Sequence, residues 1–268
     1  MGVEGLRFVI TGAAAGIGAA TARLAASRGA SVMLSDLDDT KGEAVAAEIR
    51  ATGGAAAFTH CDVTDEAQVA ALMRATAETF GGIDVLHNNA GIHETAVSGD
   101  VDLESMSLAT FRKVLEVNAV GPWLCAKHAL PWLKESANAS IVNAASTGSW
   151  VGYPNNVAYG TSKGGIHLQT KNLAVDLARY GIRVNCYSPT AIATEMTTQF
   201  VESQPDPAAF EKALVSTSLI PRLGKPVEVA ELVCFLAGPE SAFVNGACIV
   251  IDGGSLAWRG TVDQLGLG

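Results

Sequence analysis

Short apolar runs alternate along this chain with longer segments that carry the apolar spacing of helices. The short runs are apolar nearly throughout, which is typical of strands buried on both faces of a sheet. Strand–helix alternation predicts right-handed crossovers, and therefore an α/β fold with a doubly wound parallel sheet of about seven strands and helices on both faces. We expect strands over 6–11, 31–36, 56–61, 84–88, 140–146, 182–188 and 247–252, and helices over 17–29, 39–52, 65–80, 103–118, 121–136, 156–180 and 226–237.

The 268 residues fit a single domain, because α/β folds of this length are commonly one unit. Residues 189–225 interrupt the alternation, with several prolines and only a short amphipathic pattern near 207–217. Such long segments usually serve as lids or binding loops. We therefore expect one domain over 1–268 with a substrate-loop insertion at about 189–225 and a short C-terminal tail at about 254–268.

Composition excludes several classes of partner. The net charge is −9, without a basic stripe, which argues against nucleic acid and anionic membranes as partners. No apolar run approaches the ~18 residues of a membrane span, and the N-terminus has no signal-peptide pattern. The five cysteines form no C-x-x-C pair, and the five histidines show no metal-ligand spacing. We expect a cytoplasmic protein with reduced cysteines and no metal.

The stretch TGAAAGIG follows the first expected strand and opens the first expected helix. Its glycines, Gly12, Gly16 and Gly18, would let the backbone approach a pyrophosphate at the helix N-terminus, where free N–H groups favour anions. The alternative is a glycine–alanine turn selected for tight packing. The strand–turn–helix context favours the nucleotide site.

Asp36 ends the second expected strand, where a carboxylate can accept hydrogen bonds from an adenosine ribose. The same carboxylate would repel a 2′-phosphate, and the neighbouring positions 13–15 and 37 hold no cation to compensate. The alternative is a helix cap, a role that Asp38 or Asp39 would fill equally well.

Two further groups of polar residues suit the same site. Asn88 to Gly91, in the sequence NNAG, ends the fourth strand, although such residues are also common in turns. Tyr159 and Lys163 lie one turn apart on an expected helix, so an ammonium group would face a phenol and lower its pKa. The alternative for this pair is a solvated position on the surface.

Taken in order, these motifs resemble the short-chain dehydrogenase/reductase family, in its compact single-domain form. The resemblance runs from Leu6 to about Gly254 through TGAAAGIG, CDV, NNAG, VNAVG, NAAS, YGTSK, NCYSP and IDGG. It implies a Rossmann-like fold and hydride transfer between a nicotinamide coenzyme and a secondary alcohol or ketone. With Asp36, the expected coenzyme is NAD.

The resemblance also implies a catalytic tetrad of Asn118, Ser146, Tyr159 and Lys163. Tyr159 would be the base, Ser146 would bind the substrate oxygen, and Asn118 would hold a proton-relay water. The implied coenzyme-binding residues are Gly12, Ala15, Gly16, Ile17, Gly18, Asp36, Leu37, Asp62, Val63, Asn89, Ala90, Gly91, Tyr159, Lys163, Pro189, Ile192 and Thr194. One departure is Thr190, which stands where the family usually has glycine.

The residues that can border Ser146 and Tyr159 predict a neutral and fairly bulky substrate, plausibly cyclic. We expect the pocket to be lined by His93, Ser146, Trp150, Tyr153, Met196 and Phe200. Two alternatives stay open, an NADPH-dependent ketoreductase of acyl-carrier thioesters and a catalytically silent dinucleotide sensor or scaffold. The resemblance and the apolar helix faces also predict a homotetramer.

Overall fold

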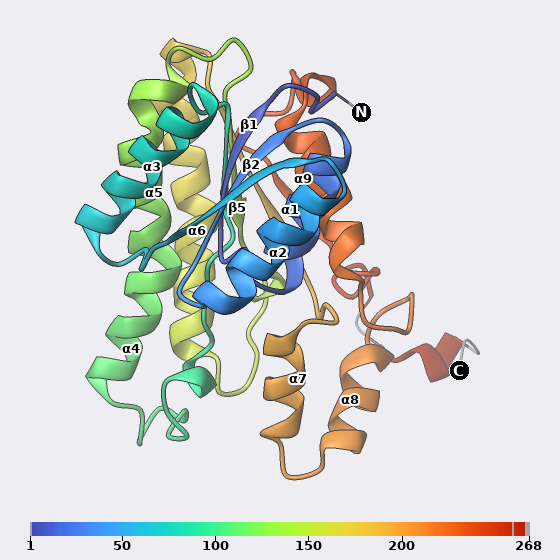
Figure 1. Ribbon diagram of the computed structural model, residues 1–268. Coiled ribbons are helices and arrows are strands. Elements are labelled where there is room, and N and C mark those ends of the chain that lie inside the picture. The colour runs from blue at the N-terminus through green and yellow to red at the C-terminus, as the bar shows by residue number, and fades with distance from the viewer. Residues whose placement is uncertain (1, 259, 266–268) are drawn as a thin grey trace.

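The computed structural model describes residues 2–258 and 260–265 and contains a parallel sheet of seven strands in the order β3-β2-β1-β4-β5-β6-β7 (Figure 1). The expected α/β fold class and doubly wound sheet are therefore confirmed. The strands are β1 (Arg7–Thr11), β2 (Ser31–Asp36), β3 (Ala55–His60), β4 (Val85–Asn88), β5 (Ser140–Ala144), β6 (Arg183–Pro189) and β7 (Cys248–Ile251).

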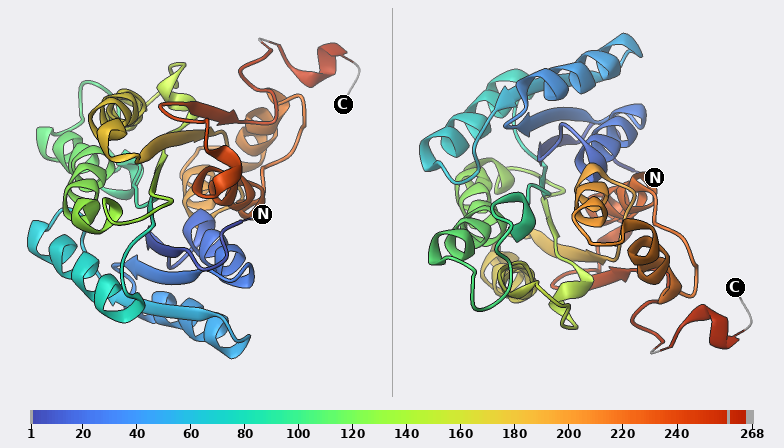
Figure 2. Two further views of the ribbon diagram at one scale, coloured as in Figure 1. Left: turned by 90° about the horizontal axis from the view of Figure 1, so that it is seen from above. Right: turned by 90° about the horizontal axis from the view of Figure 1, so that it is seen from below.

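Helices cover both faces of this sheet (Figure 2). They are α1 (Gly16–Ser27), α2 (Asp39–Ala51), α3 (Glu66–Phe80), α4 (Leu108–Leu115), α5 (Gly121–Leu133), α6 (Val157–Leu177), α7 (Glu195–Glu202), α8 (Pro207–Ser216) and α9 (Pro226–Ala237). Within the part of the chain that the structure describes, none of the helices has the length and apolar character needed to cross a membrane.

Two apolar layers hold the helices to the sheet. One layer joins α1 and α9 to β1 and β2 through small side chains such as Ala22 and Ala237, and the other joins α3 and α5 to the opposite face through larger ones such as Leu72 and Leu133. The strand order reverses between β1 and β4, so the chain leaves these two strands in opposite directions. In open parallel sheets, ligands bind outside the carboxyl ends of the strands at such a switch point.

The structure departs from the expected elements in two places. The segment expected over 103–118 becomes a helix only at Leu108, because Ser107 caps it, and the helical path then passes through a π-helical turn at Glu116–Val120. Residues 189–225 form two short helices rather than one, α7 after Thr194 and α8 after Asp206, and each of these residues accepts a backbone N–H as the N-cap.

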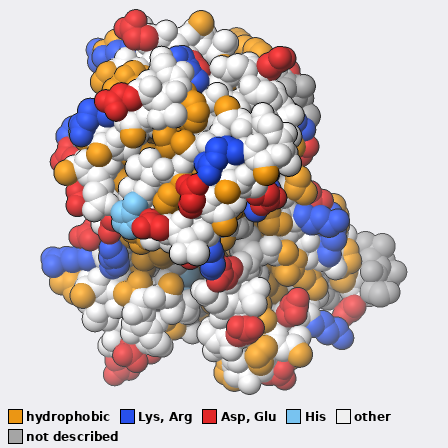
Figure 3. Space-filling view, in the orientation of Figure 1, with side chains coloured by type: hydrophobic (Ala, Val, Ile, Leu, Met, Phe, Trp, Pro, Cys, Tyr) orange, Lys and Arg blue, Asp and Glu red, His pale blue; other side chains and the backbone are white. Residues whose placement is uncertain are grey.

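The tail expected at about 254–268 is described in part, with a short 3₁₀ turn at Val262–Leu265, while positions 259 and 266–268 lie outside the described residues. On the face shown in Figure 3, basic side chains are scattered among acidic ones.

Candidate active site

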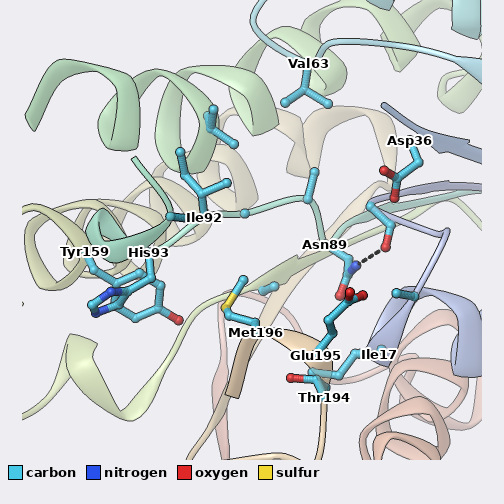
Figure 4. Close-up of a pocket in the computed structure, with 18 of the residues that line it drawn as sticks. Ile17, Asp36, Val63, Asn89, Ile92, His93, Tyr159, Thr194, Glu195 and Met196 are labelled. Carbon is cyan, nitrogen blue, oxygen red and sulfur yellow. Dashed lines mark hydrogen bonds between the residues drawn. The ribbon is translucent and has the colours of Figure 1, made fainter. Parts of the chain in front are cut away.

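A cleft of about 430 Å³ opens at the carboxyl ends of β1, β4 and β5, beside α7. It is bordered by residues of the glycine turn, the ends of the strands, the α6 helix and the first turn of α7. Those of the predicted site that border it are Gly12, Ala15, Gly16, Ile17, Asp36, Leu37, Asp62, Val63, Asn89, Ala90, Gly91, His93, Tyr159, Lys163, Pro189, Thr194 and Met196 (Figure 4). The fold thus brings most of the predicted coenzyme set into one cavity.

The glycines of the first turn have two different roles. A Cβ at Gly18 would overlap the carbonyl oxygen of Gly12, and a Cβ at Gly12 would lie 2.8 Å from the Cα of Ala90. Gly12 also has a left-handed φ of 64°, which disfavours other residues. Tight packing therefore explains Gly12 and Gly18, whereas Ala15, Gly16 and Ile17 border the cleft.

The N-terminus of α1 suits an anionic ligand. The residue before this helix, Ala15, has no side-chain oxygen with which to cap the first N–H groups. These groups and the helix dipole attract negative charge, and they border the cleft at Gly16 and Ile17. The chemistry of this end of the cavity fits the pyrophosphate of a dinucleotide.

Asp36 is held at the cleft by backbone donors. Its Oδ2 accepts from the Ala14 N–H at 2.9 Å, and its Oδ1 accepts from the Leu37 N–H at 2.8 Å. The helix cap that could have explained this aspartate is supplied by Asp38, which accepts from the Lys41 N–H at 2.9 Å. Asp36 therefore remains available to ribose hydroxyls.

A cation that the sequence did not predict lies near the Asp36 carboxylate. Lys41, in the first turn of α2, contacts Glu195 of α7 at 3.0 Å and Asp38 at 3.8 Å. Both partners are acidic, so the positive charge of Lys41 is already compensated. The ion pair also joins α2 to α7 at the end of the cleft that Asp36 borders.

Lys163 is buried and Tyr159 is half-buried, so the interpretation of this pair as a solvated surface position is wrong. The ammonium group lies 5.6 Å from the centre of the Tyr159 ring and donates to the Ala144 carbonyl oxygen at 2.7 Å. Lys163 is only 4% exposed. This carbonyl fixes the ammonium beneath the cleft, beside the phenol.

In the protein without coenzyme, burial is the main cause of the pKa shifts of both groups. Desolvation raises the pKa of Tyr159, with the neighbouring Ser146 hydroxyl acting in the opposite direction and the Glu94 carboxylate raising it further. Desolvation also lowers the pKa of Lys163 to about 8. The expected decrease in the pKa of the phenol is therefore not achieved by Lys163 alone, and a further positive charge is needed to stabilise the phenolate.

The remaining members of the predicted tetrad lie close by. Ser146, just beyond the end of β5, is 9% exposed and accepts from the Gly148 N–H at 3.1 Å. Asn118, in the π-helical turn, accepts from the Ile92 N–H and donates to the Ile92 carbonyl oxygen, both at 2.8 Å. A Cβ at Gly91 would lie 3.3 Å from the Asn118 Oδ1 and 3.4 Å from the Lys163 Nζ, so Gly91 lies between these two side chains.

The substrate end of the cleft contains fewer of the predicted residues. The His93 ring lies beside that of Tyr159 (Figure 4), at 5.2 Å, and its centre is 4.9 Å from that of the Phe200 ring. Met196 borders the cavity directly. Together, these side chains form an apolar wall beside the phenol.

Trp150 and Tyr153, which were predicted for the substrate pocket, are not among the residues that border the cleft. The Trp150 indole N–H donates to Ser188 at 3.1 Å, and its ring packs against the tilted ring of His167, with 4.6 Å between the ring centres. The Tyr153 hydroxyl donates to Thr147. Both contacts turn the rings toward neighbouring elements.

Gly18 and Ile192 of the predicted coenzyme set also lie behind the cavity wall rather than on it. Ile192 is 5% exposed and forms a bridge with Gly224. Other residues that border the cleft were missed, notably Lys113, Tyr187 and Gln199. Of these, Tyr187 carried a usable signal, because it lies two positions before Pro189 at the carboxyl end of a strand.

Comparisons with known proteins agree with this geometry. Residues 12–255 match the family described as "Enoyl-(Acyl carrier protein) reductase". The chain is 40% identical to cis-4-hydroxycyclohexanecarboxylate dehydrogenase of Sinomonas cyclohexanicum, over 93% of this chain and 96% of that protein. It is 36% identical to 2,5-dichloro-2,5-cyclohexadiene-1,4-diol dehydrogenase of Sphingobium indicum, over 95% and 98% respectively. The crystal structure of levodione reductase superposes with a TM-score of 0.89 at 35% identity, covering 95% of this chain and 99% of that one.

The chain therefore belongs to the short-chain dehydrogenase/reductase family. It is an oxidoreductase that acts on a small molecule, and enzymes of this family use nicotinamide coenzymes.

Proposed function

We propose that this protein is an NAD-dependent dehydrogenase that interconverts a secondary alcohol on a six-membered ring and the corresponding ketone. The observation that carries the proposal is the meeting of Asp36, the α1 N-terminus, Tyr159 and Lys163 in one cleft. A silent sensor or scaffold on the same fold has no need for a half-buried phenol beside a buried ammonium group in this cleft.

The chemistry follows from the position of the proton donors and acceptors. When bound, the oxidised nicotinamide would accept hydride at C4, and its positive ring would stabilise the phenolate form of Tyr159. Tyr159 then takes the hydroxyl proton of the alcohol, and Ser146 donates to the same oxygen. Lys163 holds the nicotinamide ribose, and Asn118 fixes the loop at Ile92 beside it.

The preference for NAD over NADP is supported by the charges at the adenosine end. Asp36 borders the cleft, and its negative charge would repel a 2′-phosphate on an adenosine ribose bound beside it. Lys41 is the nearby cation, but it is paired with Glu195 and Asp38. This arrangement disfavours the NADPH ketoreductase.

The substrate class is supported by the wall around His93 and by the relatives. Two similar proteins are named for substrates on a cyclohexane or cyclohexadiene ring, which supports the ring but not its charge, because one of these substrates carries a carboxylate. The cations among the described residues that border the cleft are Lys113 and Lys163, and both face acceptors, Asp62 at 3.9 Å and Ala144 at 2.7 Å. Recognition of a carboxylate or phosphate usually requires an arginine or lysine fork, so we infer a neutral substrate.

A turnover screen tests this function. Cyclohexanols, linear secondary alcohols, hydroxy acids and 3-hydroxyacyl thioesters would be compared with NAD⁺ and NADP⁺, and kcat/KM would rank each pair. We expect neutral ring alcohols with NAD⁺ to rank first. A lead of more than about tenfold for an anionic substrate, or equal values for the two coenzymes, would refute the corresponding part of the proposal.

We also propose a homotetramer in the cytoplasm. Exposed apolar side chains lie on α5 and α6 and on the edge strand β7, including Trp123, Leu168, Val175 and Val250, and such faces suit burial against a second copy. All five cysteines are free thiols, which supports a reducing compartment. A monomeric mass by light scattering at micromolar concentration would refute the tetramer.

A further inference from the structure

Two polar aromatic side chains meet in the middle of the sheet. His87 of β4 and Tyr187 of β6 are both 0% exposed, and the His87 Nε2 lies 3.0 Å from the Tyr187 hydroxyl. The strands β4 and β6 are separated by β5, where Tyr187 is in register with Ala144 and His87 with Val142. The tyrosine therefore reaches back diagonally over β5 to the histidine. Burial of polar groups lowers the stability of the fold unless they are hydrogen-bonded, so both side chains need partners inside the protein.

The groups around the Tyr187 hydroxyl determine the direction of its hydrogen bonds. The Tyr187 hydroxyl also lies 3.3 Å from the Asn89 Oδ1, which can only accept, so the single hydroxyl proton is directed to Asn89. Burial lowers the pKa of His87 to about 3, and the imidazole is therefore neutral near pH 7. Its Nε2–H must then donate to the hydroxyl oxygen. The chain of donors runs from His87 through Tyr187 to Asn89.

The orientation of the Asn89 amide is fixed at its other end. Its Nδ2 donates to the Thr11 carbonyl oxygen at 3.1 Å and to the Gly12 carbonyl oxygen at 2.9 Å. Both of these groups only accept, so the amide has one orientation in which all of its contacts are satisfied. In Figure 4 the Asn89 side chain is turned toward the glycine turn. The two strands β4 and β6 therefore hold the glycine turn through a single amide.

The amide end of this chain borders the cleft. Gly12, Asn89 and Tyr187 all line the cavity, and a Cβ at Gly18 would lie 2.7 Å from the Asn89 Nδ2. The amide is thus packed between the turn and the end of β4 with little free space. A small rotation of the amide would change the path of the backbone that precedes α1, where the coenzyme phosphates are expected.

We propose that Tyr187 is a positioning residue of the coenzyme site. Its hydroxyl, oriented by the buried His87, holds the Asn89 amide so that the glycine turn keeps the shape that accepts the coenzyme. The proposal rests on the proposed function, because it requires a coenzyme in this cleft. The competing explanation is that His87 and Tyr187 only satisfy each other and stabilise the core.

Tyr187→Phe tests the proposal, since it removes only the hydroxyl oxygen. The Kd of NADH would be measured by fluorescence titration on folded protein, together with kcat and KM for NAD⁺. We expect the Kd and the KM to rise about tenfold, the effect of one lost hydrogen bond, and kcat at saturating NAD⁺ to stay within about twofold. The matched control is Tyr180→Phe, whose ring contacts Lys134 and Arg179 away from the cleft, and which should change neither constant.

The double variant His87→Leu/Tyr187→Phe separates positioning from stability. Tyr187→Phe leaves the histidine without its acceptor and should lower Tm, whereas the double variant removes both polar groups and should recover much of that loss. Coenzyme affinity should remain weak in the double variant, because Asn89 still lacks its donor. In an Asn89→Ala background, Tyr187→Phe should cause no further loss of affinity.

Three results would overturn the inference. They are an unchanged Kd in Tyr187→Phe, affinity that returns together with Tm in the double variant, and a full additional loss in the Asn89→Ala background. The proposed function fails separately, if the wild-type protein neither binds NADH nor reduces NAD⁺.

Discussion

The two ends of the cleft are built in different ways. At the coenzyme end, Gly12, Gly18 and Asn89 interlock with the first strands, and Asp36 is held by backbone N–H groups. At the substrate end, α7 contributes one buried residue, Val201, and α8 none. The coenzyme end is therefore part of the core, whereas the wall of the substrate end can change without loss of the fold. Variants of the shared catalytic groups and of the coenzyme end should have large and specific effects.

Tyr159→Phe should have the largest effect. Removal of the ionisable oxygen eliminates the base, so kcat should fall by more than about 100-fold, equivalent to ~2.7 kcal/mol, while the Kd of NADH changes little. Steady-state kinetics and coenzyme titration measure the two quantities. The control is Tyr180→Phe, and retention of more than about a tenth of the wild-type kcat would contradict the assignment.

Lys163→Met should lower both the catalytic rate and the affinity for the coenzyme. The ammonium group is assigned to the phenolate and to the nicotinamide ribose, so kcat and coenzyme affinity should each fall by about tenfold or more. Lys171→Met, on the exposed face of the same helix, is the matched control. A loss confined to kcat would remove the ribose role from Lys163.

Asp36→Ala should act at the coenzyme end alone. Loss of the carboxylate removes both the ribose acceptor and the repulsion of a 2′-phosphate, so the ratio of kcat/KM for NAD⁺ over NADP⁺ should fall by about tenfold. Asp39→Ala, which alters an exposed carboxylate three positions on, should leave the ratio unchanged. An unchanged ratio in Asp36→Ala would mean that other groups select the coenzyme.

Glu94→Gln should have the smallest effect, visible in the pH profile. The buried Glu94 carboxylate accepts from the Tyr159 N–H at 3.2 Å and raises the pKa of the phenol. Alcohol oxidation requires the phenolate, so its rate rises with pH through the pKa of Tyr159. Loss of the negative charge lowers that pKa, and the rising limb of kcat/KM should move to lower pH, by less than about one unit.

In this variant the glutamine retains an oxygen for the Tyr159 N–H, and Glu104→Gln on the surface is the control. A limb that stays in place, or moves to higher pH, would show that Glu94 does not influence the base.

Most residues that the sequence predicted for the coenzyme end border the cleft, because their signals are local. The glycine turn and Asp36 follow directly after strands, and the parallel order of the strands then brings their ends together. The substrate end was predicted less well, because its side chains depend on distant partners. Trp150, for example, donates to Ser188 of β6. At the coenzyme end, the hydrogen bonds between His87, Tyr187 and Asn89 were also missed, because they appear only once the strand order is known.

Local signals also failed for α7, whose short sequence EMTTQFVE has weak helical character apart from the Thr194 cap. The pKa of Tyr159 was predicted in the wrong direction for the protein alone, since spacing reveals a neighbouring lysine but not the extent of burial.

Transfer of deuterium tests the central claim most directly. Wild-type protein would be given NAD⁺ and a cyclohexanol labelled with deuterium at the carbinol carbon, and the NADH formed would be analysed by mass spectrometry. If this cleft transfers hydride, the NADH carries the deuterium and Tyr159→Phe forms almost none of it. NADH without the label, or no NADH from any secondary alcohol tested, would contradict the assignment of this cleft as a site of hydride transfer.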